Sequence, residues 1–317
     1  MTTIQSIDLH TRKLRYFLVV AEELHFSRAA ARVYLTQQAL SRQIKELEEE
    51  LGIQLFERTT RRVELTPAGR AFHGSVRELL GSFDDAVELA RRTDRALSGR
   101  LRLGFCPGAA LELTAPIMDA FREAYPDVEV EMREFPANDP SAGLASGVTD
   151  VAFIRLPQGT AKIETEELYV DPVIAVVARS HRLAGRTSVV AADLVGERLT
   201  LSDTPDDTYC DFWSLAEARP AGTAGSFVRV SSVTEEMAIV SAGGAICVTS
   251  SAAGAFTPMP GVRYLPIEDW PGSVVALGWH QGERSAIVAR FVQTVCEVRD
   301  RETELVASME SRSVGGA

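Results

Sequence analysis

The stretch FSRAAARVYLTQQALSRQIKELEEELGIQLFERTTRRVELTPAG, residues 26–69, decides the fold of the first part of the chain. Ser27 is a candidate N-cap for a short segment rich in alanine, and Thr36 is a candidate N-cap for the next segment. Gly52 ends this second segment, whose apolar residues recur at spacings of four, three and four: Leu40, Ile44, Leu47 and Leu51. Small residues allow two short helices to cross closely, so the pattern predicts a helix-turn-helix whose second helix presents its first turns to the major groove of DNA.

The polar residues at the front of the second predicted helix lie on the face opposite the leucines. Glutamine can pair with adenine, arginine with guanine, and serine with either base or with phosphate. Glutamates fill the later turns and would repel phosphate, which confines DNA contact to the front of the helix. Residues 54–56 and 63–65 predict two short strands around the basic stretch 58–62, a wing that can follow the DNA backbone or enter the minor groove. The candidate DNA-binding residues are Ser27, Arg28, Thr36, Gln37, Gln38, Ser41, Arg42, Lys45, Arg58, Arg61 and Arg62.

Residues 14–69, LRYFLVVAEELHFSRAAARVYLTQQALSRQIKELEEELGIQLFERTTRRVELTPAG, resemble the winged helix-turn-helix of LysR-type transcriptional regulators without a break. The resemblance implies a sequence-specific DNA-binding regulator of transcription. Gln38 is a departure, because the family often has proline at this position of the recognition helix. The alternative is a structural helical hairpin with a solvated charged face, which the agreement of capping, periodicity and wing disfavours.

A long helix is predicted directly after the wing. Pro67 suits the first turn of a helix, and apolar positions recur at helical spacing as far as residue 96. Such a helix is about 40 Å long at a rise of about 1.5 Å per residue. The resemblance implies a linker helix that pairs two subunits, and a reader of pseudo-palindromic DNA works as one of a pair. We therefore expect a homo-oligomer, a dimer or a dimer of dimers (homotetramer), and the alternative is a helix packed on its own winged domain.

Strands and helices alternate through the rest of the chain, which predicts a parallel sheet built from βαβ units. Strands are expected at 100–106, 128–132, 151–154, 173–178, 198–201, 227–230, 245–248 and 273–279, and helices at 111–125, 141–146, 206–218, 234–242 and 285–306. Two α/β lobes joined by crossing strands form the architecture of periplasmic binding proteins, with a ligand cleft at the hinge. The runs YPDVEVEM, DVAFIR and SAGGAICV are similar to the effector-binding domain of LysR-type regulators.

The expected fold is therefore an N-terminal winged helix-turn-helix, mainly α, plus a long linker helix, then an α/β two-lobed periplasmic-binding-protein-like effector domain. The expected domains are 1–67 for DNA binding, 68–97 for the linker and dimerisation helix, and 98–317 for effector binding. Lobe I is expected to cover about 98–171 and 270–307, and lobe II about 172–269.

Candidate effector-binding residues lie where strands end and helices begin, because free backbone N–H groups at helix N-termini favour anions. They are Pro107, Gly108, Ala137, Asn138, Arg155, Ser202, Thr204 and Thr249. Arg155 is the foremost candidate, since a guanidinium can clamp a carboxylate with two hydrogen bonds, and the alternative is a salt bridge at the lobe edge. The resemblance implies an organic acid or an aromatic compound as effector. Relatives often have Ser or Thr at the first two of these loops, so the usual carboxylate-binding set is incomplete here.

Net charge and cysteine content exclude fewer classes of function than the sequence motifs do. Residues 1–95 hold 15 Lys and Arg against 14 Asp and Glu, and the remaining residues hold 18 against 30. A net charge of −11 still permits DNA binding through a local basic surface. The four cysteines form no C-x-x-C pair: Cys106, Cys210, Cys247 and Cys296. Their spacing indicates buried reduced thiols, and a peroxide-sensing pair is the alternative.

Other function classes lack their motifs. The sequence has no G-x-x-x-x-G-K loop, no G-x-S-x-G elbow and no histidine cluster, so we expect no enzyme activity, no cofactor and no metal. A signal peptide and an apolar run of about 18 residues are also missing, which predicts a cytoplasmic protein without membrane contact. The expected partners are double-stranded promoter DNA, a small-molecule effector, RNA polymerase and further copies of the chain. The alternatives are a redox-responsive regulator of the same fold and a cytoplasmic small-molecule-binding protein without sequence-specific DNA reading.

Overall fold

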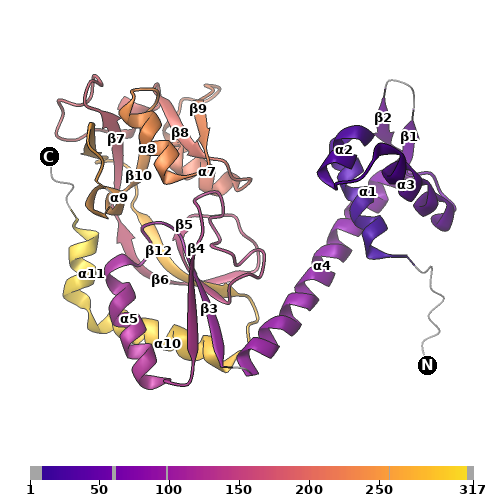
Figure 1. Cartoon of the computed structure of the whole chain (residues 1–317). Helices are drawn as coiled ribbons and strands as arrows, with labels where there is room; N and C mark the ends of the chain where they lie inside the picture. Colours follow the sequence, from indigo (N-terminus) through magenta and orange to yellow (C-terminus); the bar gives the residue numbers. More distant parts are fainter. Residues whose placement is uncertain (1–8, 59–61, 98, 257, 313–317) are drawn as a thin grey trace. The chain divides into compact units, whose positions relative to one another are not determined.

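The computed structural model describes residues 9–58, 62–97, 99–256 and 258–312 (Figure 1). The chain divides into two compact units, residues 1–91 and 92–317, which are described in turn. Within the described ranges, no helix has the length and apolar character needed to cross a membrane.

The first unit is a small helical domain with a two-stranded wing. It contains α1 (Thr11–Glu23), α2 (Phe26–Arg32), α3 (Gln37–Leu51), β1 (Phe56–Arg58), β2 (Val63–Leu65) and the N-terminal part of α4 (Pro67–Leu97). Phe17 of α1 is fully buried, and its ring centroid lies 5.4 Å from that of Phe56 and 5.2 Å from that of Phe72. Leu40 and Ile44 are buried on the same core, which confirms the apolar stripe predicted along α3.

Local hydrogen bonds set both ends of α3. Thr36 caps the helix as predicted, because its Oγ1 accepts a hydrogen bond from the backbone N–H of Ala39 at 3.2 Å. Gly52 ends the helix as predicted, in the left-handed region at φ +68°. The start and the direction of the second helix of the helix-turn-helix therefore follow from two local residues.

The prediction that Ser27 caps α2 is wrong. His25 is the N-cap, and its Nδ1 accepts a hydrogen bond from the backbone N–H of Arg28 at 3.4 Å. The helix begins at Phe26, which is buried in the core of the first unit, so burial of this ring fixes the helix start. Ser27 is then the second residue of the helix, and its Oγ donates to Oε1 of Gln37 at 2.7 Å.

The wing is tied directly to α3. β1 and β2 pair in antiparallel fashion, from Phe56 opposite Leu65 to Arg58 opposite Val63. Oε1 of Glu48 in α3 accepts hydrogen bonds from the backbone N–H groups of Leu55 at 2.9 Å and Phe56 at 3.0 Å. The first strand begins at Phe56 rather than at residue 54 as predicted, since residue 54 precedes the first paired position.

The second unit begins with a five-stranded sheet in the order β4-β3-β5-β12-β6. Its strands are β3 (Arg100–Phe105), β4 (Glu129–Glu134), β5 (Val151–Leu156), β6 (Ile163–Asp171) and β12 (Ser273–His280), and its helices are α5 (Leu111–Ala124), α10 (Ala286–Arg301) and α11 (Thr303–Glu310). β3 pairs in parallel with β4 and β5, whereas β12 runs antiparallel to β5 and β6. The predicted parallel pairing therefore holds for β3, β4 and β5 but is wrong for β12, which returns from the other lobe.

A second lobe has its own sheets. β7 (Val173–Ala178) pairs antiparallel with β10 (Cys247–Ser250) and β11 (Val262–Pro266), and β8 (Arg198–Ser202) pairs parallel with β9 (Ser226–Val230). Its helices are α6 (Ala191–Leu194), α7 (Asp207–Trp213), α8 (Val233–Ser241) and α9 (Ser251–Phe256), with a 3-10 turn at η1 (Ala216–Ala218). One core draws on residues within 101–169 and 275–309, and two others on residues within 173–267. The chain thus crosses between lobes after Asp171 and again before β12.

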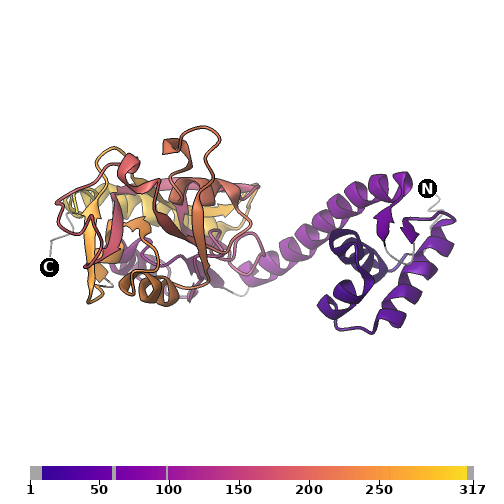
Figure 2. The same ribbon diagram turned by 90° about the horizontal axis from the view of Figure 1, so that it is seen from above.

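Several parts of the second unit differ from the predicted elements. The helix predicted at 206–218 ends at Trp213, because Leu215 has a φ of +57°, and a 3-10 turn follows it. The helix predicted at 141–146 is a series of turns, in which Ala142 and Gly143 have φ values of +49° and +86° that no α-helix contains. The helix predicted at 285–306 is interrupted at Glu302, between α10 and α11. β6, β11, α6 and α9 were not predicted. Figure 2 shows the same elements from above.

Candidate functional site

The front of α3 presents polar side chains to solvent. Gln37, Gln38 and Arg42 are exposed, and Ser41 is half-buried. Oε1 of Gln37 accepts the hydrogen bond from Ser27, which leaves the amide N–H donors of Gln37 for an acceptor outside the protein. The structure therefore brings the predicted base-reading residues onto one exposed surface and gives one of them a fixed orientation.

The exposed basic residues of this surface are paired with glutamates. The pairs are Arg28 with Glu23 at 3.1 Å, Arg42 with Glu46 at 2.9 Å, and Lys45 with Glu49 at 3.4 Å. The side chain of Arg42 is 80% exposed in its pair. Exposed pairs of this kind contribute only about 0–1 kcal/mol, so a phosphate or a base can displace the glutamate at little cost.

The wing residues are described only in part. Arg62 pairs with Glu64 of β2. Arg61 lies outside the described residues, and the side chain of Arg58 is also outside the description although its backbone belongs to β1. The basic character of the wing near Arg62 is consistent with a backbone-following role.

Tyr34 was not among the candidate DNA-binding residues predicted from the sequence. It lies in the turn between α2 and α3, its side chain is 95% exposed, and its φ is +55°, which is uncommon for a residue other than glycine. The position is two residues before Thr36, the N-cap of α3, so the residue adjoins the front of the helix. The signal in the sequence that could have identified Tyr34 is a bulky aromatic residue within a predicted turn.

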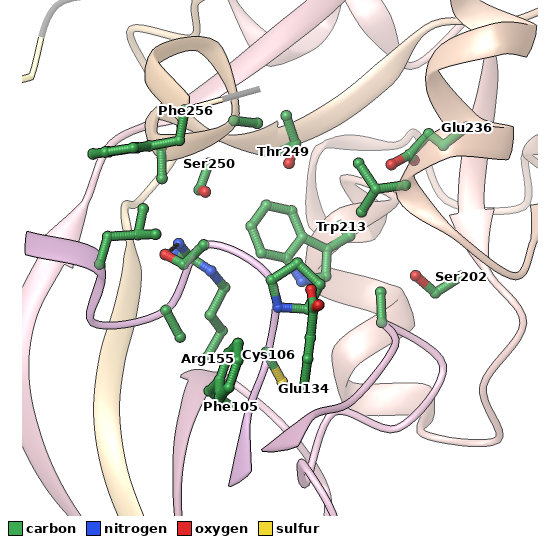
Figure 3. A pocket seen from close by; sticks show the side chains of 18 of the residues that line it. Phe105, Cys106, Glu134, Arg155, Ser202, Trp213, Glu236, Thr249, Ser250 and Phe256 are labelled. Atoms are coloured by element: carbon green, nitrogen blue, oxygen red, sulfur yellow. Dashed lines mark hydrogen bonds between the residues drawn. The ribbon is translucent and has the colours of Figure 1, made fainter. Parts of the chain in front are cut away.

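A pocket of about 580 Å³ lies between the two lobes of the second unit (Figure 3). Six of the eight candidate effector-binding residues line it: Pro107, Gly108, Ala137, Arg155, Ser202 and Thr249. Asn138 and Thr204 are not among the lining residues. Thr204 is buried, and its Oγ1 accepts a hydrogen bond from the backbone N–H of Asp206 at 3.3 Å, which directs this hydroxyl toward the start of α7.

Arg155 is already engaged within the chain. It is 5% exposed, and its Nη2 donates to Oδ2 of Asp171 at 2.8 Å and to the backbone oxygen of Gly108 at 2.6 Å. Nη1 is buried without a hydrogen-bond partner. The salt bridge considered as the alternative is thus present, and it is buried beside the crossing between the lobes rather than at a solvated edge.

Asp171, the last residue of β6, is the centre of a wider network. Its Oδ1 accepts a hydrogen bond from Oγ of Ser251 in the second lobe at 2.6 Å. Nη1 of Arg312 lies 3.9 Å from the same oxygen, and Nη2 of Arg312 donates to Oε1 of Glu112 in α5 at 2.5 Å. The Arg312 guanidinium also lies 5.3 Å from the centroid of the Phe256 ring on the pocket wall. The network links α5, the crossing, α9 and the segment after α11.

Seven of the other lining residues are aromatic or acidic, and the sequence did not identify them as candidates. These residues are Phe105, Glu134, Phe153, Tyr209, Trp213, Glu236 and Phe256. Oε1 of Glu236 accepts a hydrogen bond from Oγ1 of Thr200 at 2.6 Å, and burial raises the pKa of the Glu236 carboxyl. Tyr209, Trp213 and Glu236 come from the helices α7 and α8, so a search limited to strand ends could not find them. Glu134 is the last residue of β4, and it was missed because this strand was predicted to end at residue 132.

The cysteines are free thiols, and Cys106 lies on the pocket wall. Burial raises the pKa of Cys106 to about 12 and also raises the pKa of Cys247. Cys210 is buried, and Nη1 of Arg229 donates to its Sγ at 3.4 Å. A thiol with a raised pKa is a poor nucleophile at neutral pH, because the thiolate is the reactive form.

Comparisons with known proteins cover both units. Residues 11–70 match the family described as bacterial regulatory helix-turn-helix protein, lysR family, and residues 94–299 match the LysR substrate binding domain. The HTH-type transcriptional regulator AlsR of Bacillus subtilis (strain 168) is 36% identical over 211 residues, which are 66% of this chain and 70% of AlsR. The HTH-type transcriptional regulator BudR of Raoultella terrigena is 30% identical over 290 residues, 90% of this chain and 99% of BudR. A solved structure of a Corynebacterium glutamicum OxyR mutant, H2O2-bound, is 27% identical, covers 95% of each chain and has a TM-score of 0.51.

Proposed function

The chain belongs to the LysR family of bacterial regulatory helix-turn-helix proteins, and from that membership we propose that α3 reads promoter DNA under the control of a small molecule bound in the pocket. It is a DNA-binding transcriptional regulator with an effector-binding domain. The proposed limits of the DNA-binding domain, linker helix and effector domain are 1–67, 68–97 and 98–317. The observation that carries the finer proposal is that an exposed polar helix front and an enclosed pocket occur in the two segments that match the family.

In the proposed DNA complex, the front of α3 lies in the major groove. Gln37, Gln38, Ser41 and Arg42 contact base edges, whereas Ser27, Arg28, Thr36, Lys45 and the wing arginines Arg58, Arg61 and Arg62 contact the sugar-phosphate backbone. Support comes from the exposure of Gln37 and Arg42 and from the free amide donors of Gln37.

We propose that α4 joins copies of the chain into a dimer or a dimer of dimers. Leu79 and Phe83 are 58% and 48% exposed, and they lie four residues apart on one face of this helix. Large apolar side chains that share an exposed face mark an association surface. A pair of copies also supplies the two recognition helices that a dyad-symmetric site requires.

The effector acts by favouring one arrangement of the regulator over another. A ligand shifts such an equilibrium only through different affinities for the two arrangements. A pocket between lobes joined by two crossings meets this condition, since closing the lobes changes the contacts that a ligand makes. We propose that lobe closure alters DNA geometry and recruitment of RNA polymerase, and that the protein acts in the cytoplasm, where promoter DNA is found.

The test is selection of genomic fragments by the purified full chain at near-physiological salt, followed by sequencing. The expected result is enrichment of a dyad-symmetric site beside a promoter, because the exposed front of α3 carries base-reading groups. Uniform recovery of all sequences, falling steeply with added salt, would show phosphate binding without base reading and would contradict the proposal.

A redox-responsive regulator of the same fold is the second candidate. It is supported by the relationship to an OxyR structure with bound H2O2. The thiols argue against it, because burial raises the pKa of Cys106, Cys247 and Cys296 and so suppresses their thiolates. Control by a bound small molecule is therefore the better-supported proposal.

A further inference from the structure

The electrostatics of the pocket differ from those of a site for an anion. Arg155 is the one basic residue among the described lining residues, and its charge is balanced by Asp171 at 2.8 Å. Both partners of this pair are almost fully buried, so solvent does not screen their attraction strongly. A ligand carboxylate would therefore have to share Arg155 with a carboxylate that the chain already provides.

Two further acidic groups belong to the pocket wall. Glu134 comes from β4 in the first lobe and Glu236 from α8 in the second. Figure 3 shows both side chains directed into the space that also contains the Trp213 ring. The hydrogen bond from Thr200 holds Glu236 in place, and burial makes its negative charge costly in the absence of a cation. The described lining therefore has more acidic than basic groups.

Aromatic rings also line the pocket. Phe105, Tyr209, Trp213 and Phe256 lie on the pocket wall, and the ring centroids of Tyr209 and Trp213 are 5.9 Å apart. Aromatic faces attract organic cations and also pack against apolar rings. Desolvating a negatively charged ligand beside two carboxylates is unfavourable, whereas a positively charged ligand gains from both the acids and the rings.

We propose that the pocket takes an organic amine, with an aromatic or aliphatic body among the rings and a protonated nitrogen facing Glu236 and Glu134. Nη1 of Arg155, buried without a partner, serves as a donor to a hydroxyl or carbonyl oxygen at the other end of the ligand. This inference rests on the proposed function, because it names the chemical class of the effector for the same pocket. It replaces the organic acid expected from sequence.

The test compares three probes of similar size and different charge on the full chain: phenethylamine, phenethyl alcohol and phenylacetate. Binding is measured by calorimetry and by fluorescence, since Trp213 lies on the pocket wall. The expected order is amine, then alcohol, then carboxylate, with the amine at least about tenfold tighter than the carboxylate. Equal or tighter binding of phenylacetate, or the lack of any amine preference up to about 10 mM probe, would overturn the proposal.

Variants test which carboxylate is responsible for the preference for the amine probe. Glu236→Gln keeps an acceptor for Thr200 and removes the charge, and it should reduce the amine preference by about tenfold. Glu131→Gln is the matched control, because this exposed carboxylate lies on β4 but does not line the pocket. An unchanged preference in Glu236→Gln would overturn the assigned role of this residue.

DNA binding of the same protein separates the two proposals. Retained recovery of a specific DNA site by a chain that prefers phenylacetate contradicts only the amine proposal. Loss of sequence-specific recovery contradicts the proposed function itself, whatever the probes do.

Discussion

At the scale of single residues, base reading depends on side chains whose partners are weak. Arg42 is held only by an exposed pair with Glu46, and Gln37 is oriented by Ser27. Each can therefore turn to a base edge without giving up a strong interaction. The proposed reading of DNA by α3 rests on this low cost as much as on the residue types.

Replacing Arg42 or Gln37 by alanine should weaken binding to the selected site by about 1–3 kcal/mol per lost base contact. Arg42→Lys is the matched control for charge, since lysine keeps the cation but loses the planar bidentate donor. We expect this variant to retain its affinity for random duplex and to lose affinity for the specific site. Titration of both duplexes by fluorescence anisotropy checks the prediction, and equal losses on the two would assign these residues to phosphate contact.

The sequence was sufficient for the local role of Thr36 but not for that of Ser27. Thr36 could be predicted as a cap because the acceptor and the donor are three residues apart. Arg155 was placed near the pocket by the end of its strand, but its pairing with Asp171 depends on the fold of two strands. Glu236 has no local pattern that marks a ligand site, so only the structure could bring it to the pocket.

At the scale of elements, periodicity predicted what is buried on one side. The stripe along α3 was found for this reason, as were buried strands such as β5 and β7. β6 was missed because its sequence IETEELYVD is acidic and only three of its nine residues are buried, and its pairing with β12 comes from distant sequence. The turns at 141–146 were mistaken for a helix, because the positive φ values there are a tertiary consequence.

The exposed face of α4 leads to a prediction about assembly. Leu79→Glu together with Phe83→Glu should shift the chain toward monomers, because paired helices would bury like charges in place of two apolar side chains. Sedimentation velocity over a range of concentrations measures the change. Arg77→Glu is the control on the same helix, since it adds charge at an exposed position that is already polar. A double variant that assembles like the parent chain would contradict the role of this face.

At the scale of the whole effector-binding unit, charges rather than a continuous core connect the lobes. Asp171 bonds Arg155 and Ser251, and Arg312 extends the network to Glu112. The cores on either side are separate, and the network lies at the crossing between them.

Removing one side chain of this network should change how much its partners contribute to the free energy of unfolding. Arg312→Ala leaves Glu112 without its basic partner, whereas Asp171 keeps Arg155, so we expect a loss of about 1–3 kcal/mol in the free energy of unfolding. Glu112→Ala in the same chain should then cost less than it does alone, with a coupling energy of about 0.5–3 kcal/mol. Urea unfolding followed by tryptophan fluorescence measures this unit selectively, because Trp213, Trp270 and Trp279 all belong to it. Additive losses would show that Arg312 and Glu112 act independently.

The two-lobed architecture and the family could be expected from the sequence, because alternating elements and a contiguous motif carry them. The balance of acidic and basic groups in the pocket could not be expected from the sequence. It depends on which side chains the two lobes turn toward each other, and Glu134 and Glu236 are far apart in the sequence. The prediction of an organic acid or an aromatic compound rested on Arg155 and on the family resemblance, and it did not take these acids into account.

If Gln37 reads base edges as proposed, the hydrogen bond from Ser27 gives α2 a part in the choice of operator sequence. In the structure the Ser27 hydroxyl donates to the amide oxygen of Gln37, so the amide donors face outward. In a diverging relative of this regulator, a mutation at Ser27 would remove this hydrogen bond and allow the Gln37 amide to flip. The resulting regulators would then recognise a different operator sequence, although every residue of α3 stays the same.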